Sequence, residues 1–301
     1  MDGVLVVDKP AGPTSHDIVD RVRRALREKR VGHTGTLDPF ATGVLALCVG
    51  KATRLARFLA GGTKEYRACV RLGFATTTDD LTGEPIGEPA ATQVAPEALR
   101  AALAALVGRY DQVPPAFSAR HVSGRRSYEL ARRGEAAARP ATAVTVHAIE
   151  LVSFAGDRLE VDVRCSAGTY VRAIARDLGE RLGVGAHLTA LRRTRSGEFD
   201  LAQAVPGDDL TEAPRRLIPM AALLPELPVV KVPAASLKLV RDGRELGPEA
   251  VSGFPSEALA RVRLLDEAGS LIGLAVPRGL EPGSGSLPRF PQLHADVVLL
   301  D

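Results

Sequence analysis

A polar loop between two apolar segments holds the residues of this sequence that are best suited to chemistry. It runs from His33 to Thr42 and places Asp38 directly before Pro39. Proline disfavours helical geometry at the residue before it, and the flanking glycines let the backbone approach a ligand closely. The loop could therefore present a carboxylate for nucleophilic or acid–base work. The residues alone also allow a simpler role, in which Asp38 only caps the following turn.

A buried carboxylate needs a cationic or hydrogen-bonding partner if it is to stay ionised. Arg172, next to Tyr170 at the start of an expected helix, is a candidate, although it could also be a surface arginine of that helix. Tyr66, at the start of an expected strand, could stack on a nucleic-acid base or belong to the core. Because the sequence has 4 Tyr and no Trp, each aromatic residue matters for any stacking role.

Other common catalytic and cofactor motifs are absent from the sequence. There is no P-loop, GxSxG or HExxH pattern, and the glycines at 183 and 185 lack the third glycine of a dinucleotide-binding loop. The cysteines at 48, 69 and 165 form no CxxC pair, which argues against a zinc site or a disulfide framework. Nucleotide cofactors, serine hydrolysis and zinc proteolysis are therefore disfavoured.

Hydrophobic periodicity predicts the elements that must position these residues. Strands are predicted at 3–7, 44–49, 66–72, 144–152 and 159–165, and helices at 51–59, 96–107 and 170–182. A further helix begins after Thr14, which with Asp17 resembles a capping box. The apolar face expected for that helix consists of Ile18, Val22, Ala25 and Leu26.

A proline-rich stretch marks a predicted domain boundary. Five prolines lie between positions 206 and 228, and short apolar strands separated by Gly and Pro turns follow in 229–301. This tail is typical of a small β-barrel or β-sandwich. The earlier segment 114–140 is poor in apolar residues and rich in charge, so we expect an exposed excursion there.

Length and composition indicate a globular protein of two domains. The chain has 301 residues, of which 45% are hydrophobic and 25% charged, and a net charge of only +3. A uniformly basic nucleic-acid coat is excluded, but local basic patches are not. The start of the chain does not resemble a signal peptide, and no run approaches the roughly 18 apolar residues of a membrane span. We expect a cytoplasmic protein with no membrane association.

Several segments between residues 3 and 200 resemble, in order and spacing, the motifs of the TruB family. Members of this family are bacterial tRNA pseudouridine synthases that act on the T-loop uridine at tRNA position 55. The sequence GHTGTLDPFATGVL at 32–45 resembles the catalytic motif. The other similar segments are 5–15, 64–67, 114–119, 165–172 and 191–194.

The resemblance implies a role for each matching residue. Asp38 would be the catalytic carboxylate, acting on a flipped-out uridine by attack at C1′ or through a glycal-type intermediate. Tyr66 would stack on the target base, and Arg172 would pair with Asp38 and hold it charged.

Further residues are implied in substrate binding and in support of the site. Tyr170 and Leu191 would line the pocket, and His33 would fill the space left by the extruded base. Lys9 would support the site structurally, and Lys64 belongs to the tyrosine motif.

The excursion at 114–140 resembles an RNA-gripping insertion. Its Arg120 and Arg125 would contact phosphates. His121 stands where the family usually has Lys, which weakens a phosphate contact at neutral pH because His is then mostly neutral.

The implied architecture is α+β. It comprises a pseudouridine synthase domain at 1–228, with a mixed or antiparallel sheet flanked by helices, and a β-rich PUA-like RNA-binding domain at 229–301. The implied substrate is the T-arm stem-loop of tRNA, bound by a monomer without metal, organic cofactor or guide RNA. Three alternatives remain: a non-catalytic RNA-binding or tRNA-folding protein, a guide-RNA-dependent synthase and a base-excising glycosylase.

Overall fold

The computed structural model describes most of the chain. The described residues are 1–88, 93–117, 140–255, 260–278 and 292–300, together with the backbone of β8 (His121–Val122) and β9 (Arg125–Arg126). The predicted insertion at 114–140 therefore lies largely outside the described residues. Within the described part, no helix is both long and apolar enough to cross a membrane.

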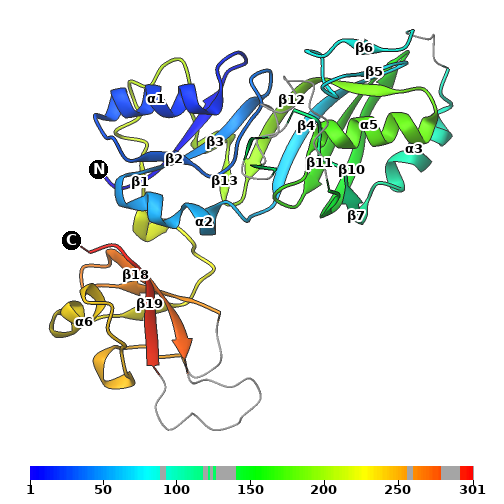
Figure 1. The fold of residues 1–301 in the computed structure, drawn as a ribbon. Helices are drawn as coiled ribbons and strands as arrows, with labels where there is room; N and C mark the ends of the chain where they lie inside the picture. The colour runs from blue at the N-terminus through cyan, green and yellow to red at the C-terminus, as the bar shows by residue number, and fades with distance from the viewer. Residues whose placement is uncertain are drawn as a thin grey trace, which may run out of the picture.

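A large mixed sheet forms the body of the molecule (Figure 1). Its strands follow the order β14-β1-β3-β12-β4-β11-β10-β7, in which only the β1–β14 and β12–β3 pairs are parallel. Their bounds are β1 (Gly3–Lys9), β3 (Thr42–Val49), β4 (Lys64–Leu72), β7 (Gly108–Gln112), β10 (Thr142–Ala155), β11 (Arg158–Cys165), β12 (Ala186–Ser196) and β14 (Val205–Pro206). The predicted strands are all present.

Short strands extend this sheet or pair separately. β2 (Val31–His33) pairs with β3, β13 (Phe199–Asp200) with β12, and β15 (Ile218–Pro219) with β1. A separate hairpin consists of β5 (Ala75–Thr76) and β6 (Pro85–Ile86).

Three longer helices pack against the large sheet (Figure 1). They are α1 (Ser15–Leu26), α3 (Pro96–Ala104) and α5 (Val171–Leu182). The capping box of Thr14 and Asp17 is confirmed at the start of α1. Ala25 was wrongly expected on the buried face of α1: it is exposed, and Val19 is buried instead. The segment predicted as a helix at 51–59 divides into a 3-10 helix, Gly50–Leu55, and the short α2 (Ala56–Leu59).

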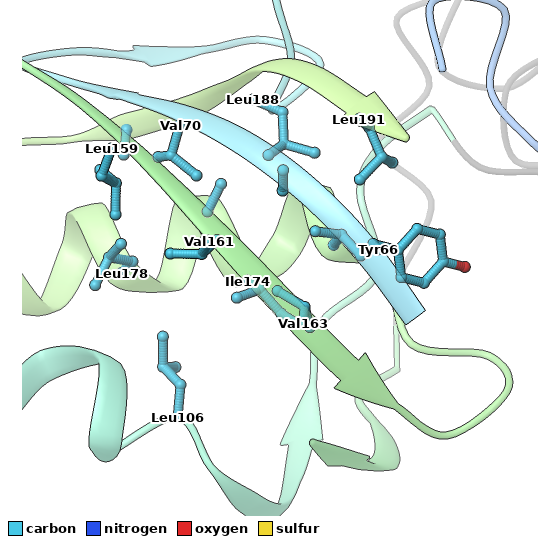
Figure 2. Packing of buried hydrophobic residues seen from close by; sticks show 14 of the residues in the cluster. Tyr66, Val70, Leu106, Leu159, Val161, Val163, Ile174, Leu178, Leu188 and Leu191 are labelled. Carbon is cyan, nitrogen blue, oxygen red and sulfur yellow. The ribbon is translucent and has the colours of Figure 1, made fainter. Parts of the chain in front are cut away.

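Two apolar clusters hold these helices on the sheet. The apolar face of α1 packs against β1 and β3, whereas α5 and α3 pack against β4, β11 and β12. Figure 2 shows the second cluster, in which Val161, Ile174 and Leu178 meet between α5 and the strands. Tyr66 lies at the edge of this cluster and directs its phenol oxygen away from the aliphatic side chains.

A second, four-stranded sheet lies below β1 and α2 (Figure 1). Its order is β16-β17-β18-β19, with bounds β16 (Val229–Lys231), β17 (Val262–Leu265), β18 (Leu271–Arg278) and β19 (Gln292–Val298); the short α6 (Leu237–Arg241) lies in the same part. The α+β class with a β-rich tail is thus confirmed. Leu271 and Leu274 also share a cluster with Val4 and Phe199, so the tail packs directly on the main body. The boundary at 228 stays a prediction.

Candidate active site

The Asp38 loop leaves the large sheet where one edge of β3 changes its partner. Residues 47–49 of β3 pair with β2, and residues 42–43 pair with β12. The loop that joins β2 to β3 therefore ends beside β12, a strand from a distant part of the chain. Gly43 has a φ of 100°, and a Cβ there would lie 2.2 Å from the Arg193 carbonyl oxygen, so only glycine allows β12 to approach this closely.

Two buried cations hold the backbone of the loop. Lys9 is fully buried, and its Nζ donates hydrogen bonds to the carbonyl oxygens of Pro39 at 3.1 Å and Ala41 at 2.8 Å. Arg193 donates from Nη2 to Gly35 O at 3.0 Å and from Nε to Val44 O at 2.7 Å. Because these cations are removed from water, their bonds to backbone oxygens restrain the loop on both sides of Asp38.

Asp38 is paired with Arg172, the arginine that the sequence analysis proposed as its partner. Arg172 Nε lies 2.9 Å from Asp38 Oδ2, and Arg172 Nη2 donates to Asp38 Oδ1 at 3.1 Å. The Arg172 side chain is 4% exposed and the Asp38 side chain 34% exposed. The pair therefore fixes the carboxylate while leaving one side of it accessible.

The same guanidinium joins two further segments to the site. Arg172 Nη1 lies 3.5 Å from Asp80 Oδ2 and donates to Thr78 O at 3.0 Å, and Nη2 donates to Phe117 O at 2.8 Å. Asp80 is itself held by hydrogen bonds from Thr78 and Thr82. Arg172 thus connects the loop after β5, the residues after β7 and the Asp38 loop.

Burial decides the protonation behaviour of Asp38. Desolvation raises the pKa of its carboxyl above the ordinary 3.8, and the nearby Asp80 carboxylate acts in the same direction. The Arg172 guanidinium and the Lys9 ammonium oppose this rise. A carboxylate that is desolvated yet held ionised by a cation is more reactive as a nucleophile or base than one in water.

A cavity of about 460 Å³ opens beside Asp38. Tyr66, Tyr170 and Leu191 line it, together with Lys64 and Arg172. Tyr66 on β4 and Leu191 on β12 are offset by two positions, since Tyr66 is paired with Arg193, and Tyr170 immediately precedes α5. The volume, the two aromatic rings and the single carboxylate suit a flat heterocycle held next to Asp38.

Cationic side chains lie in the wall of the cavity and behind the Asp38 loop. Lys64 is 5% exposed, burial lowers its pKa to about 8, and its Nζ donates to Ala60 O at 3.1 Å. Desolvation also raises the pKa of the Tyr66 phenol, so Tyr66 is neutral at physiological pH. Burial lowers the pKa of Lys9 to about 8 as well. These groups would favour a substrate that develops negative charge.

The remaining predicted residues do not line the cavity or lie outside the described residues. His33 ends β2 and is half-buried; its Nδ1 has no hydrogen-bond partner among the described residues, and burial lowers its pKa. It does not line the cavity. Lys9 lies behind the loop rather than in the cavity. Arg120 and the side chains of His121 and Arg125 lie outside the described residues.

Sequence reasoning missed two residues of this arrangement. Arg193 falls within the segment 191–194 but was assigned no role, and Asp80 was not singled out. A signal for Asp80 exists in the run of threonines and aspartates at 76–80, because such residues often fix a tight loop by side-chain bonds. For a metal ion, no group of three or more His, Cys, Asp or Glu side chains comes together among the residues that the structure describes.

Comparisons with known proteins identify the family of the chain. A family model described as TruB family pseudouridylate synthase (N terminal domain) matches residues 23–171. A second, described as tRNA pseudouridylate synthase B C-terminal domain, matches residues 172–218. A protein named tRNA pseudouridine synthase B from Solibacter usitatus is 43% identical over 91% of this chain and 95% of its own. One of the same name from Thermobifida fusca is 48% identical over 84% of this chain and 89% of its own.

Solved structures share the fold. A chain in the crystal structure of a Cbf5-Nop10-Gar1 complex matches with a TM-score of 0.75 and 26% identity, covering 99% of this chain and 85% of that chain. A chain in the structure of an H/ACA RNP bound to a substrate RNA containing 2′-deoxyuridine matches with a TM-score of 0.73 and 24% identity, covering 99% and 85%. Sequence and fold agree, and the chain belongs to the TruB family of pseudouridylate synthases.

Proposed function

We propose that this protein is an isomerase that converts a uridine of tRNA to pseudouridine, and that its target is the T-loop uridine at position 55. One observation carries the proposal: Arg172 holds Asp38 at 2.9 Å beside a cavity lined by Tyr66, Tyr170 and Leu191. The relatives from Solibacter usitatus and Thermobifida fusca are named tRNA pseudouridine synthase B, which supports pseudouridine formation in tRNA.

The residues of the site suit each requirement of this reaction. The target uridine must leave the base stack before its glycosidic bond can be reached, and the cavity beside Asp38 would receive it. Tyr66 would stack on the base. Asp38 would attack C1′ or remove a proton in a glycal route, and both routes need its ionised form. Arg172 would maintain that form, and Lys64 and Arg193 would stabilise negative charge on the detached uracil.

We further propose that the T-arm stem-loop suffices as substrate and that a monomer acts without guide RNA or cofactor. The sequence resemblance of 114–140 to an RNA-gripping insertion supports this, with Arg120 and Arg125 as phosphate contacts and His33 filling the vacated stack. A guide-RNA-dependent synthase is the second candidate; the same fold is found in a chain of the Cbf5-Nop10-Gar1 complex, an assembly of several components.

Mapping of pseudouridine in RNA tests the proposal. Unmodified tRNA transcript, or a T-arm stem-loop alone, is incubated with the purified protein, and pseudouridine is located by carbodiimide treatment and reverse-transcription stops. We expect one stop, at position 55, with either RNA. Release of free uracil would identify a glycosylase, and a requirement for added guide RNA would favour the second candidate.

We also propose that residues 229–301 bind RNA as a PUA-like module. Because Leu271 and Leu274 pack on the main body, deletion would expose its core. Charge reversal at the exposed Lys231 and Arg244 is a milder test. We expect weaker stem-loop or tRNA binding with an unchanged rate at saturating RNA, whereas unchanged binding to both RNAs would contradict the proposal.

A further inference from the structure

A buried glutamine lies behind the catalytic arginine. Gln112 ends β7 and is 1% exposed. Its Oε1 accepts a hydrogen bond from the backbone N–H of Tyr170 at 2.8 Å, and its Nε2 donates to the carbonyl oxygen of the same residue at 3.2 Å. One side-chain amide thus satisfies both backbone groups of a single residue, which fixes that residue in position and orientation.

Tyr170 is the residue from which α5 begins. Its backbone is extended, with φ −98° and ψ 112°, and no side chain caps the helix from within. The Tyr170 carbonyl also accepts the first helical bond, from Ile174 N at 3.2 Å. Gln112 therefore fixes the N-cap residue from outside the helix, and with it the position from which the first turn of α5 begins. Arg172 lies in that turn.

The remaining proton of the amide ties Gln112 to α5 at a second point. Nε2 donates to the Tyr110 hydroxyl at 2.7 Å, and that hydroxyl donates to Asp177 Oδ2 at 3.3 Å. Asp177 lies in the second turn of α5 and is paired with Arg176 at 2.8 Å. Gln112 is thus connected to the helix both at its start and, through Tyr110, about two turns further along.

We propose that Gln112 is a positioning residue of the reaction, which sets Tyr170 and, through the first turn of α5, directs the Arg172 guanidinium onto Asp38. The inference rests on the proposed function and adds a residue to it. Gln112 does not line the cavity and acts only through Tyr170 and Arg172. A purely structural glutamine would affect stability but would leave the chemistry of Asp38 unchanged.

The test replaces Gln112 with Leu, which has a similar volume and no polar atoms, and with the isosteric Glu, which loses both donors. Single-turnover rates at saturating T-arm stem-loop separate chemistry from binding. We expect the Gln112→Leu rate to fall by about 10- to 100-fold, because small displacements of reacting groups cost this much. The dissociation constant should change by less than about 3-fold, because phosphate contacts dominate RNA affinity.

A pH–rate profile gives a readout that a structural role would not move. The charged groups facing Asp38 are Arg172 from α5, Asp80 from the loop after β5 and Lys9 from β1. If Arg172 is displaced, it opposes the burial-driven rise in the Asp38 pKa less well. The acid limb of the profile should therefore move to higher pH in both Gln112 variants.

Two matched variants control the comparison. Asp111→Asn alters the exposed neighbour on β7, and Leu103→Ala removes a core contact from α3. Both should keep the wild-type rate and acid limb, even though Leu103→Ala lowers the melting temperature. A Gln112→Glu protein with the wild-type rate and an unshifted acid limb of the pH–rate profile would overturn the proposal. So would a rate loss in Gln112→Leu no greater than that of Leu103→Ala.

A crystal structure of Gln112→Glu, or of Gln112→Leu where that variant folds, separates this inference from the proposed function. If the wild type forms no pseudouridine, the proposed function fails, but the crystal structures of the variants still show whether the contact between Arg172 and Asp38 has changed. A lengthened or disordered contact between Arg172 Nε and Asp38 Oδ2 supports the inference. Retention of the wild-type separation of 2.9 Å refutes it.

Discussion

Two arginine–aspartate pairs in this molecule have nearly the same geometry and opposite electrostatic outcomes. Arg67 on β4 donates to both oxygens of Asp162, its cross-strand neighbour on β11, at 2.8 Å each. Arg172 holds Asp38 at 2.9 and 3.1 Å. The hydrogen bonds from Arg67 lower the pKa of Asp162, whereas burial raises the pKa of Asp38 in spite of its arginine.

Burial accounts for the difference. The side chains of Arg67 and Asp162 are 50% and 41% exposed, so water solvates both charges and the pair is only a surface ion pair. The two aspartates differ little in exposure, since the Asp38 side chain is 34% exposed, but the Arg172 side chain is only 4% exposed. The Asp38 pair therefore lies in a poorly solvated environment, in which desolvation outweighs the effect of the arginine on the Asp38 pKa. The same two functional groups therefore give a surface contact in one place and a reactive carboxylate in the other.

The largest contrast should come from removing the carboxylates. We expect Asp38→Asn to reduce pseudouridine formation by at least about 10⁴-fold, because the reacting group is lost. Asp162→Asn should change the rate by less than about 2-fold. Single-turnover assays on unmodified tRNA measure both, and a filter-binding assay should show that Asp38→Asn still binds tRNA. Conversion by Asp38→Asn would refute the assigned role of Asp38.

Conservative replacement of the arginines comes next. Lysine keeps the charge but loses the planar fork, so Arg172→Lys should lower the rate by about 10²-fold. Arg67→Lys is the matched control and should stay within about 2-fold of the wild type. Equal effects of the two substitutions would show that burial does not distinguish these pairs.

The pH dependence follows from the direction of the Asp38 shift. Because its pKa is raised above 3.8, the carboxyl becomes protonated, and activity falls, at a higher pH than for an ordinary aspartate. The rate measured at subsaturating RNA reports the free protein. In Arg172→Lys the limb should move to still higher pH, and in Arg67→Lys it should not move. A wild-type limb at or below pH 3.8 would contradict the environment assigned to Asp38.

The smallest expected effect concerns stability. Asp162 has a lowered pKa in the folded protein, so its pairing stabilises the fold above the unfolded value near 3.8, and this stabilisation is lost as the pH falls through the folded value. Asp162→Asn should lower the melting temperature by less than about 2 °C at neutral pH. Thermal scans should show this gap closing at acid pH; a gap that widens would contradict the sign.

Most elements could be predicted from the sequence, but one central strand could not. Strands such as β4 and β11 alternate apolar and polar residues because one face of each is buried. The start of α1 is marked in the sequence by its capping box. β12 was not predicted as a strand because two of its buried positions carry His187 and Arg193, which interrupt the alternation of apolar and polar residues. These polar side chains are acceptable inside only because partners from other segments bind them, and no local pattern reveals such partners.

The candidate site was recognised through motifs and completed by the fold. Asp38, Tyr66, Tyr170, Arg172, Leu191 and Lys64 come together around one cavity. Arg193, Asp80 and Gln112 were not assigned from the sequence, because their contacts with residues more than 50 positions away belong to no motif that gives them a role. For Asp80, the run of threonines and aspartates at 76–80 signals only a local turn. Arg120 and Arg125 stay predictions.

The sequence by itself determined which groups were available and which local structures they would enter. It placed a carboxylate in a glycine-flanked loop, a tyrosine on an alternating strand and an arginine at the start of a helix. Only the tertiary structure decided that Asp38 and Arg172, 134 positions apart, would meet, and that Lys9 and Arg193 would hold the loop between them. The physical reason is that local conformation depends on neighbouring residues, whereas desolvation and charge pairing depend on every segment that packs around the site.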